Sequence, residues 1–200
     1  MKKYINKKSI IITSVMLLLL VTIGTTLAYI FTKTKPVANT FKPSKVSCAV
    51  VENNKEDENT NGIVQTGTTK DDVKIKNTGD TDAYIRVAVV VNWANENGTM
   101  IWAQKPTDNE YKITYNFNDG WFYGGDGFYY YSKAIPPEEL TTSLINEAKQ
   151  LKGAPQAPDG TKYYLSIEIV ASAIQSTPNT VVEEQWGVTV NNGVITSKAN

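Results

Sequence analysis

The chain of 200 residues carries 20 basic and 20 acidic side chains, one cysteine and no histidine. Without histidine it can form neither a Ser-His-Asp triad nor an H-E-x-x-H zinc helix, and one cysteine allows no internal disulfide or thiolate zinc cage. A formal net charge of zero gives no electrostatic argument for binding nucleic acid. We therefore expect no nucleic-acid partner, no bound metal and no cofactor.

Residues 1–28 have the layout of a secretory signal peptide. Four lysines flank the start of the apolar run Ile10–Ile23, and Ala28 stands where cleavage is expected. A retained anchor is the alternative, because the 24 residues from Ser9 to Thr32 carry no charge and could span a bilayer. In either case we expect the rest of the chain outside the cytoplasm, in contact with a membrane only during export or if the signal is retained.

The single cysteine, Cys48, lies in the apolar stretch Val46–Val51, which the pattern predicts to be a strand. An exported domain of about 170 residues can bury enough apolar surface to fold without disulfides. We interpret Cys48 as a small buried residue. An intermolecular disulfide or a reactive thiol is the alternative.

Alternation of apolar and polar residues predicts the first long strands. Residues 70–77 place Val73 and Ile75 on one face, and the turn-forming residues 78–82 follow. Residues 83–93 are almost continuously apolar, which is typical of a central strand covered on both sides. Asn77, together with Gly79, Asp80, Tyr84 and Arg86, is expected to stabilise the fold.

Further strands are predicted in the second half of the chain. Residues 111–117 and 163–174 alternate, residues 121–131 form a hairpin around the loop Gly124–Gly127, and residues 188–196 form a short final hairpin. Only residues 138–151 and 181–186 have a helical composition. The fold class is therefore all-β, a single antiparallel β-sandwich with one or two short helices in its connections.

Two stretches carry a resemblance to a known family. They are Gly24-Thr25-Thr26-Leu27-Ala28-Tyr29 with the segment that follows it, and Lys76-Asn77-Thr78-Gly79-Asp80-Thr81-Asp82-Ala83-Tyr84-Ile85-Arg86-Val87. Together they resemble exported proteins of Gram-positive bacteria that are processed by a SipW-type signal peptidase, a group that includes TasA and camelysin. The resemblance implies a jelly-roll-like sandwich, cleavage between Ala28 and Tyr29 with that peptidase as partner, and a surface or biofilm-matrix role.

The segment 29–45 separates the signal from the sandwich domain, residues 46–200. Within it, residues 29–41 are extended by composition, have no evident hairpin partner and contain Pro36, which suits an edge or an added strand. The resemblance implies that this segment joins subunits, and strand addition would use its apolar residues. The alternative is that it forms the first strand of its own sheet or remains disordered. The apolar residues are Tyr29, Ile30, Phe31, Val37 and Phe41.

Aromatic residues of the central hairpin form a candidate ligand surface. Trp121, Tyr123, Tyr129 and Tyr131 could stack on a sugar, although alternation across a hairpin puts about half of its aromatic residues in the core. The other tryptophans are expected to be core or lid residues. They are Trp93, Trp102 and Trp186.

Two further patterns suggest metal or enzyme chemistry. Residues 57–68 match the start of a calcium loop, but Thr68 stands where a bidentate Glu is needed, so we interpret them as a solvated loop. Camelysin-like proteins have been classed as metalloproteases, but this chain has no histidine to bind zinc. Adjacent acidic pairs such as Asp71 and Asp72 would point to opposite faces of a strand, so we expect no catalytic residues.

The sequence thus predicts a secreted, non-enzymatic surface or biofilm-matrix protein that self-assembles into fibres by N-terminal strand addition. The alternative is a monomeric extracellular module that binds a glycan or another ligand through the aromatic hairpin.

Overall fold

The computed structural model describes residues 7–8, 11–19, 44–52, 55–56, 62–64 and 69–198, with residues 55–56 described by their backbone alone. The chain divides into two compact units, residues 1–43 and 44–200. In the first unit, residues 7–8 and 11–19 are helical. Among the described residues, no helix is long and apolar enough to cross a membrane.

The predicted cleavage and assembly positions lie outside the described residues. These positions are Ala28, Tyr29, Ile30, Phe31, Val37 and Phe41. Most of the candidate calcium loop, residues 57–61 and 65–68, also lies outside them. These predictions therefore stay predictions.

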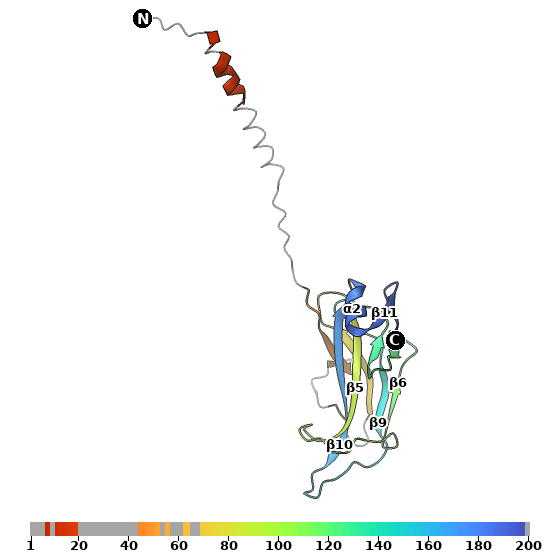
Figure 1. Cartoon of the computed structure of the whole chain (residues 1–200). Helices are drawn as coiled ribbons and strands as arrows, with labels where there is room; N and C mark the ends of the chain where they lie inside the picture. The colour runs from red at the N-terminus through yellow and green to blue at the C-terminus, as the bar shows by residue number, and fades with distance from the viewer. Residues whose placement is uncertain are drawn as a thin grey trace. The chain divides into compact units, whose positions relative to one another are not determined.

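The second unit is an antiparallel β-sandwich, as the sequence predicts (Figure 1). The first sheet has the order β2-β1-β4-β9-β6, and the second has the order β3-β10-β5-β8-β7. The strands of the first sheet are β1 (Cys48–Glu52), β2 (Lys55–Glu56), β4 (Thr69–Asn77), β6 (Tyr111–Tyr115) and β9 (Ile145–Gln150). Those of the second are β3 (Ile63–Val64), β5 (Ala83–Asn95), β7 (Trp121–Tyr123), β8 (Tyr129–Tyr131) and β10 (Tyr163–Gln175).

The two longest strands, β5 and β10, form the centre of the second sheet. They pair over all 13 residues, from Tyr163 opposite Asn95 to Gln175 opposite Ala83. Their inward-facing residues are mostly β-branched, which suits a packed sheet face. With residues of the first sheet they form the main core, which we call the inter-sheet core. Its fully buried members include Val73, Ile75, Ile85, Val87, Leu144, Ile145, Leu165 and Ile167.

A second hydrophobic cluster covers the outer face of the second sheet at one end. The helix α2 (Asn179–Trp186) and the hairpin of β11 (Val188–Asn191) and β12 (Val194–Lys198) supply most of it. We call this group the outer cluster, and Figure 1 shows α2 and β11 together at the same end of β5 and β10. Its buried members are Tyr84, Tyr130, Val182, Trp186, Val188 and Ile195. The double coverage predicted for β5 is therefore present at its Tyr84 end, whereas Ala88, Val90 and Asn92 on the same face are only half-buried.

The turn after β4 is fixed by Asn77, whose side chain is fully buried. Its amide nitrogen donates to the carbonyls of Thr81 and Ile135, both at 2.8 Å, and its oxygen accepts from the Gly79 N–H at 2.9 Å. A Cβ on Gly79 would lie 2.4 Å from the Lys45 carbonyl oxygen, so only glycine fits there. The expected stabilising role of Asn77 and Gly79 agrees with these contacts.

One predicted element is wrong. Residues 138–151 have a helical composition, but Ile145–Gln150 form β9, which lies between β4 and β6 in the first sheet. Ile145 and Ala148 are fully buried, and the register of β9 against β6 shifts between Thr114 and Tyr115. Because of this shift, the buried residues of β9 do not follow the simple alternation of a regular strand. Tertiary pairing on both edges overrides the helix propensity of Glu, Ala, Lys and Gln. The second predicted helix, residues 181–186, is confirmed within α2.

Candidate functional site

The aromatic hairpin β7–β8 forms as predicted, but both of its faces are covered. Trp121 pairs with Tyr131 and Tyr123 pairs with Tyr129, so these four side chains share the face that points toward the first sheet. Trp121 is 2 % exposed and Tyr131 is 7 % exposed, and the Trp121 indole N–H donates to the Thr142 carbonyl at 2.9 Å. These two residues belong to the inter-sheet core, so their assignment to a ligand-facing surface is wrong.

Tyr123 and Tyr129 instead join a small aromatic group at the rim of the sandwich. The Tyr129 ring stacks on Tyr115 with centroids 4.6 Å apart, and Tyr115 stacks on Phe117 at 5.6 Å. Tyr123 and Phe117 are about half exposed. We call the group of Tyr115, Phe117, Tyr123 and Tyr129 the aromatic ledge. Burial and the hydroxyl of Tyr129 raise the pKa of Tyr115, so its phenol stays neutral.

The other face of the hairpin lies against the outer cluster. Tyr130 is fully buried, and its hydroxyl donates to Asp126 at 2.8 Å. Arg86 lies between two rings, 4.2 Å from the centroid of Phe128 and 4.7 Å from that of Trp186. The hairpin is thus a layer between two hydrophobic clusters, and Tyr123 of the aromatic ledge is its most exposed aromatic side chain.

Acidic pairs and the cysteine provide no reactive constellation in the described part of the chain. Asp72 accepts from Lys74 at 2.8 Å, Glu138 pairs with Lys76 at 2.7 Å, and Glu183 accepts from the Val190 N–H at 3.0 Å. Among the described residues, no group of three or more His, Cys, Asp or Glu side chains could hold a metal ion. Cys48 is a half-buried free thiol in β1, and burial raises its pKa.

The outer edge of β10 is the feature of the fold that local sequence reasoning did not identify. The strand β3 pairs only with Leu165 and Ser166, and the last bond on that edge is from the Ile167 N–H to the Gly62 carbonyl at 2.8 Å. Beyond it, no described residue pairs with the outer edge of β10 from Glu168 to Gln175. Edge position depends on where the partner strand ends, so no local pattern in residues 163–175 could indicate it.

Apolar side chains are incompletely covered along the same edge. Ile169, Ala171 and Ala173 point into the inter-sheet core but are only half-buried, as are their neighbours Val89 and Val91 on β5. From the first sheet, β1 packs across from β10 and contributes the half-buried residues Cys48 and Val50. We call this side of the sandwich the β1–β10 edge.

Comparison with known proteins does not identify the chain. No protein-family model, no curated protein and no solved structure matches it significantly.

Proposed function

We propose that this chain is an exported, non-enzymatic structural protein of a cell surface or biofilm matrix. In this proposal, copies are joined when residues 29–41 of one copy add as a strand to the outer edge of β10 in the next. A SipW-type signal peptidase would release residue 29 as the new N-terminus. The observation that carries the proposal is the outer edge of β10 beyond Ile167, which no described residue pairs with, together with the half-buried apolar residues beside it.

The backbone of β10 supports strand addition. The Ile167 N–H points to the outer edge, where it bonds to Gly62. Because backbone groups alternate along a strand, those of residues 169, 171 and 173 point the same way. An extended segment lying along this edge would receive hydrogen bonds over several residues, which is how strand addition gains affinity.

The side chains of the β1–β10 edge support the same partner. A strand laid beside β10 would point alternate side chains toward Ile169, Ala171 and Ala173, which are half-buried. Residues 29–41 contain five large apolar residues, and burying one such side chain fully contributes roughly 1.5–3 kcal/mol. An open apolar edge is also an aggregation hazard, so a dedicated partner segment would both use it and protect it.

Particle size measured on two proteins tests the proposal. Both hydrophobic clusters lie within residues 44–198, so a protein of residues 29–200 and one of residues 42–200 both retain the folded unit. We expect the longer protein to grow into filaments as its concentration rises and the shorter one to remain monomeric. If both remain monomeric, the assembly function is wrong.

A proline at the edge of β10 locates the joint. Ala171→Pro removes an outward N–H, a change that an edge strand tolerates because no described strand pairs with that N–H. We expect the variant of residues 29–200 to fold and to lose assembly. Val170→Lys is the matched control, because Val170 is on the outer face and is 50 % exposed. We expect this variant to assemble normally. Assembly of the proline variant at the normal rate would place the joint elsewhere.

The alternative, a monomeric module that binds a glycan through the aromatic hairpin, has a smaller surface than predicted, because Trp121 and Tyr131 are in the core. Only the aromatic ledge is left to it. Quenching of tryptophan fluorescence by polysaccharide, abolished by Tyr123→Ala, would favour it.

A further inference from the structure

We propose that the pocket between Trp93 and Trp102 binds a neutral saccharide of one or two sugar units. The site lies at the end of β5 and β10 opposite the outer cluster, so it is separate from the aromatic ledge. The pocket is also separate from the β1–β10 edge and does not depend on assembly.

The pocket is formed by two loops held to the sandwich by backbone hydrogen bonds. After β5 the chain turns back, and the Trp102 N–H donates to the Trp93 carbonyl at 2.9 Å. The second loop begins where the Leu151 N–H donates to the Glu110 carbonyl at 2.7 Å, and its residues Gly153, Ala154 and Pro155 line the pocket. The pocket is open to solvent and has a volume of about 500 Å³, within the range of small-molecule sites and sufficient for one or two sugar rings.

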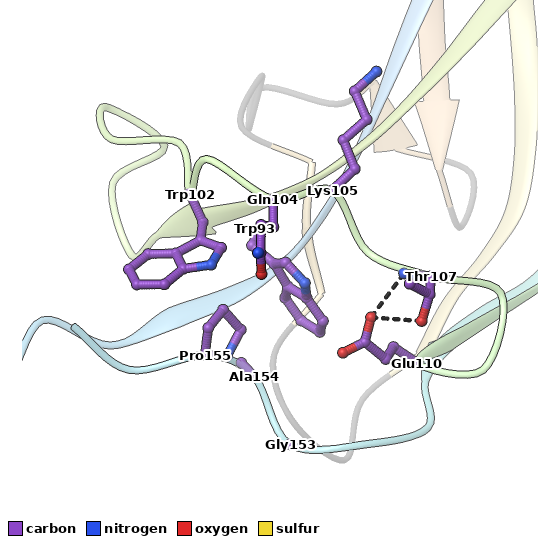
Figure 2. A pocket seen from close by; sticks show the side chains of 9 residues that line it. All are labelled: Trp93, Trp102, Gln104, Lys105, Thr107, Glu110, Gly153, Ala154 and Pro155. Carbon is purple, nitrogen blue, oxygen red and sulfur yellow. Dashed lines mark hydrogen bonds between the residues drawn. The ribbon is translucent and has the colours of Figure 1, made fainter.

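The Trp102 indole provides most of the apolar surface of the pocket. Trp102 is half-buried and held edge-on by Tyr163 with ring centroids 5.1 Å apart, whereas Trp93 is 2 % exposed and contributes only a small part of its ring. Figure 2 shows the Trp93 indole in the middle of the pocket, with Trp102 on one side and the pair of Thr107 and Glu110 on the other. Flat apolar walls with a polar tip suit the C–H face of a sugar ring, which presents hydroxyl groups around its edge.

Unused donors point to a ligand rich in acceptors. The indole N–H groups of Trp93 and Trp102 have no acceptor among the described residues, and neither nitrogen is one of the buried unpaired polar atoms of that part of the chain, so a ligand can reach both. Gln104 lines the pocket and is exposed, so its amide is also accessible. A hydroxyl oxygen of a ligand placed in the pocket would accept a hydrogen bond from these donors in place of water.

Glu110 provides the complementary acceptor. One of its carboxylate oxygens accepts from the Thr107 N–H at 2.7 Å and from the Thr107 hydroxyl at 2.8 Å, which fixes the side chain. The hydrogen bonds from Thr107 lower the pKa of Glu110, so the carboxylate is ionised at neutral pH. Its second oxygen can accept from a sugar hydroxyl in a charge-assisted bond. Lys105, a cationic residue of the lining, extends away from the indoles in Figure 2.

The test is a titration of the protein of residues 42–200, which we expect to remain monomeric, with a panel of neutral saccharides. Binding is followed by the indole N–H signals in NMR. The probes are glucose, galactose, N-acetylglucosamine and disaccharides of each. We expect at least one to shift two of the four indole signals in a saturable way. Trp93→Phe keeps most of the ring packing but lacks the N–H, so it should weaken binding about fivefold or more.

Glu110→Gln and Phe117→Ala separate the pocket from other surfaces. Glu110→Gln keeps the side-chain shape and an acceptor for Thr107, so the variant should stay folded while its binding weakens. Phe117→Ala changes the aromatic ledge alone and should leave the affinity unchanged. The inference is overturned if no probe saturates the indole shifts or if binding persists in Trp93→Phe and Glu110→Gln.

Discussion

The inter-sheet core and the outer cluster are built differently, although both pack against the second sheet. The inter-sheet core is mostly aliphatic and fully buried, with Val73, Ile85 and Ile167 at 0 % exposure. The outer cluster is aromatic and contains charged groups, with Arg86 held between two rings and Lys198 bonded to Asp126 at 2.8 Å. The inter-sheet core holds the two sheets together, whereas the outer cluster packs a helix and a hairpin onto the outer face of the second sheet.

Polar contacts at the rim of the outer cluster hold the C-terminal strand. The Lys198 ammonium donates to the Trp186 carbonyl and contacts Asp126, whose second donor is the Tyr130 hydroxyl. Burial opposes ionisation of Asp126, but hydrogen bonds from Lys198, Tyr130 and the Phe128 N–H outweigh it and lower its pKa. The partner carboxylate raises the pKa of Lys198.

The largest expected difference between the two clusters comes from truncating one isoleucine in each. Ile167→Ala should cost about 4 kcal/mol of unfolding free energy, because the rigid sheets on both sides cannot close the cavity. Ile195 is also buried but lies in a two-stranded hairpin that can shift into the cavity. Ile195→Ala should therefore cost only about 2 kcal/mol of unfolding free energy. Urea unfolding measures both values. Equal losses would show that the outer cluster is as rigid as the inter-sheet core.

A smaller effect is expected from the charge inside the outer cluster. Arg86→Met retains a long side chain between Phe128 and Trp186 but removes the cation, which should cost about 1 kcal/mol. Hydrogen exchange should show that the loss is concentrated in α2 and the final hairpin. A loss spread evenly over β5 and β10 would mean that Arg86 stabilises the sheet itself.

The smallest effect should depend on pH. Because the folded pKa of Asp126 lies below its ordinary value of 3.8, its contribution is complete above that pH and is lost as the pH falls through the lower folded pKa. Lys198 has a raised pKa, so its contribution is present below 10.5 and is lost at higher pH. Since the pair is about one-third exposed, Lys198→Met should cost less than about 1 kcal/mol at pH 7. The difference from the unsubstituted protein should be constant from pH 5 to 9 and should shrink below about pH 4. If the difference in unfolding free energy persists unchanged at pH 2.5, it comes from side-chain packing and not from the ion pair.

Much of the fold follows from the sequence alone. Alternation predicts β4, β5 and β10 with the correct buried faces, because one side of each strand must be apolar to pack against the other sheet. Turn chemistry at residues 78–82 and 191–193 predicts where the chain reverses. The layout of residues 1–28 and the extended composition of residues 29–41 lead to an exported protein with a joining segment, and that function stays a prediction.

Only the tertiary structure decided four other features. Residues 145–150 form a strand because β4 and β6 provide partners on both sides, which a local helix propensity cannot reveal. The hairpin places Trp121 and Tyr131 inside because the first sheet covers that face, whereas alternation alone assigns two faces without saying which is inner. The open edge of β10 and the pocket at Trp93 arise where partner elements end. Such ends depend on contacts between residues distant in sequence, and a local pattern carries no record of them.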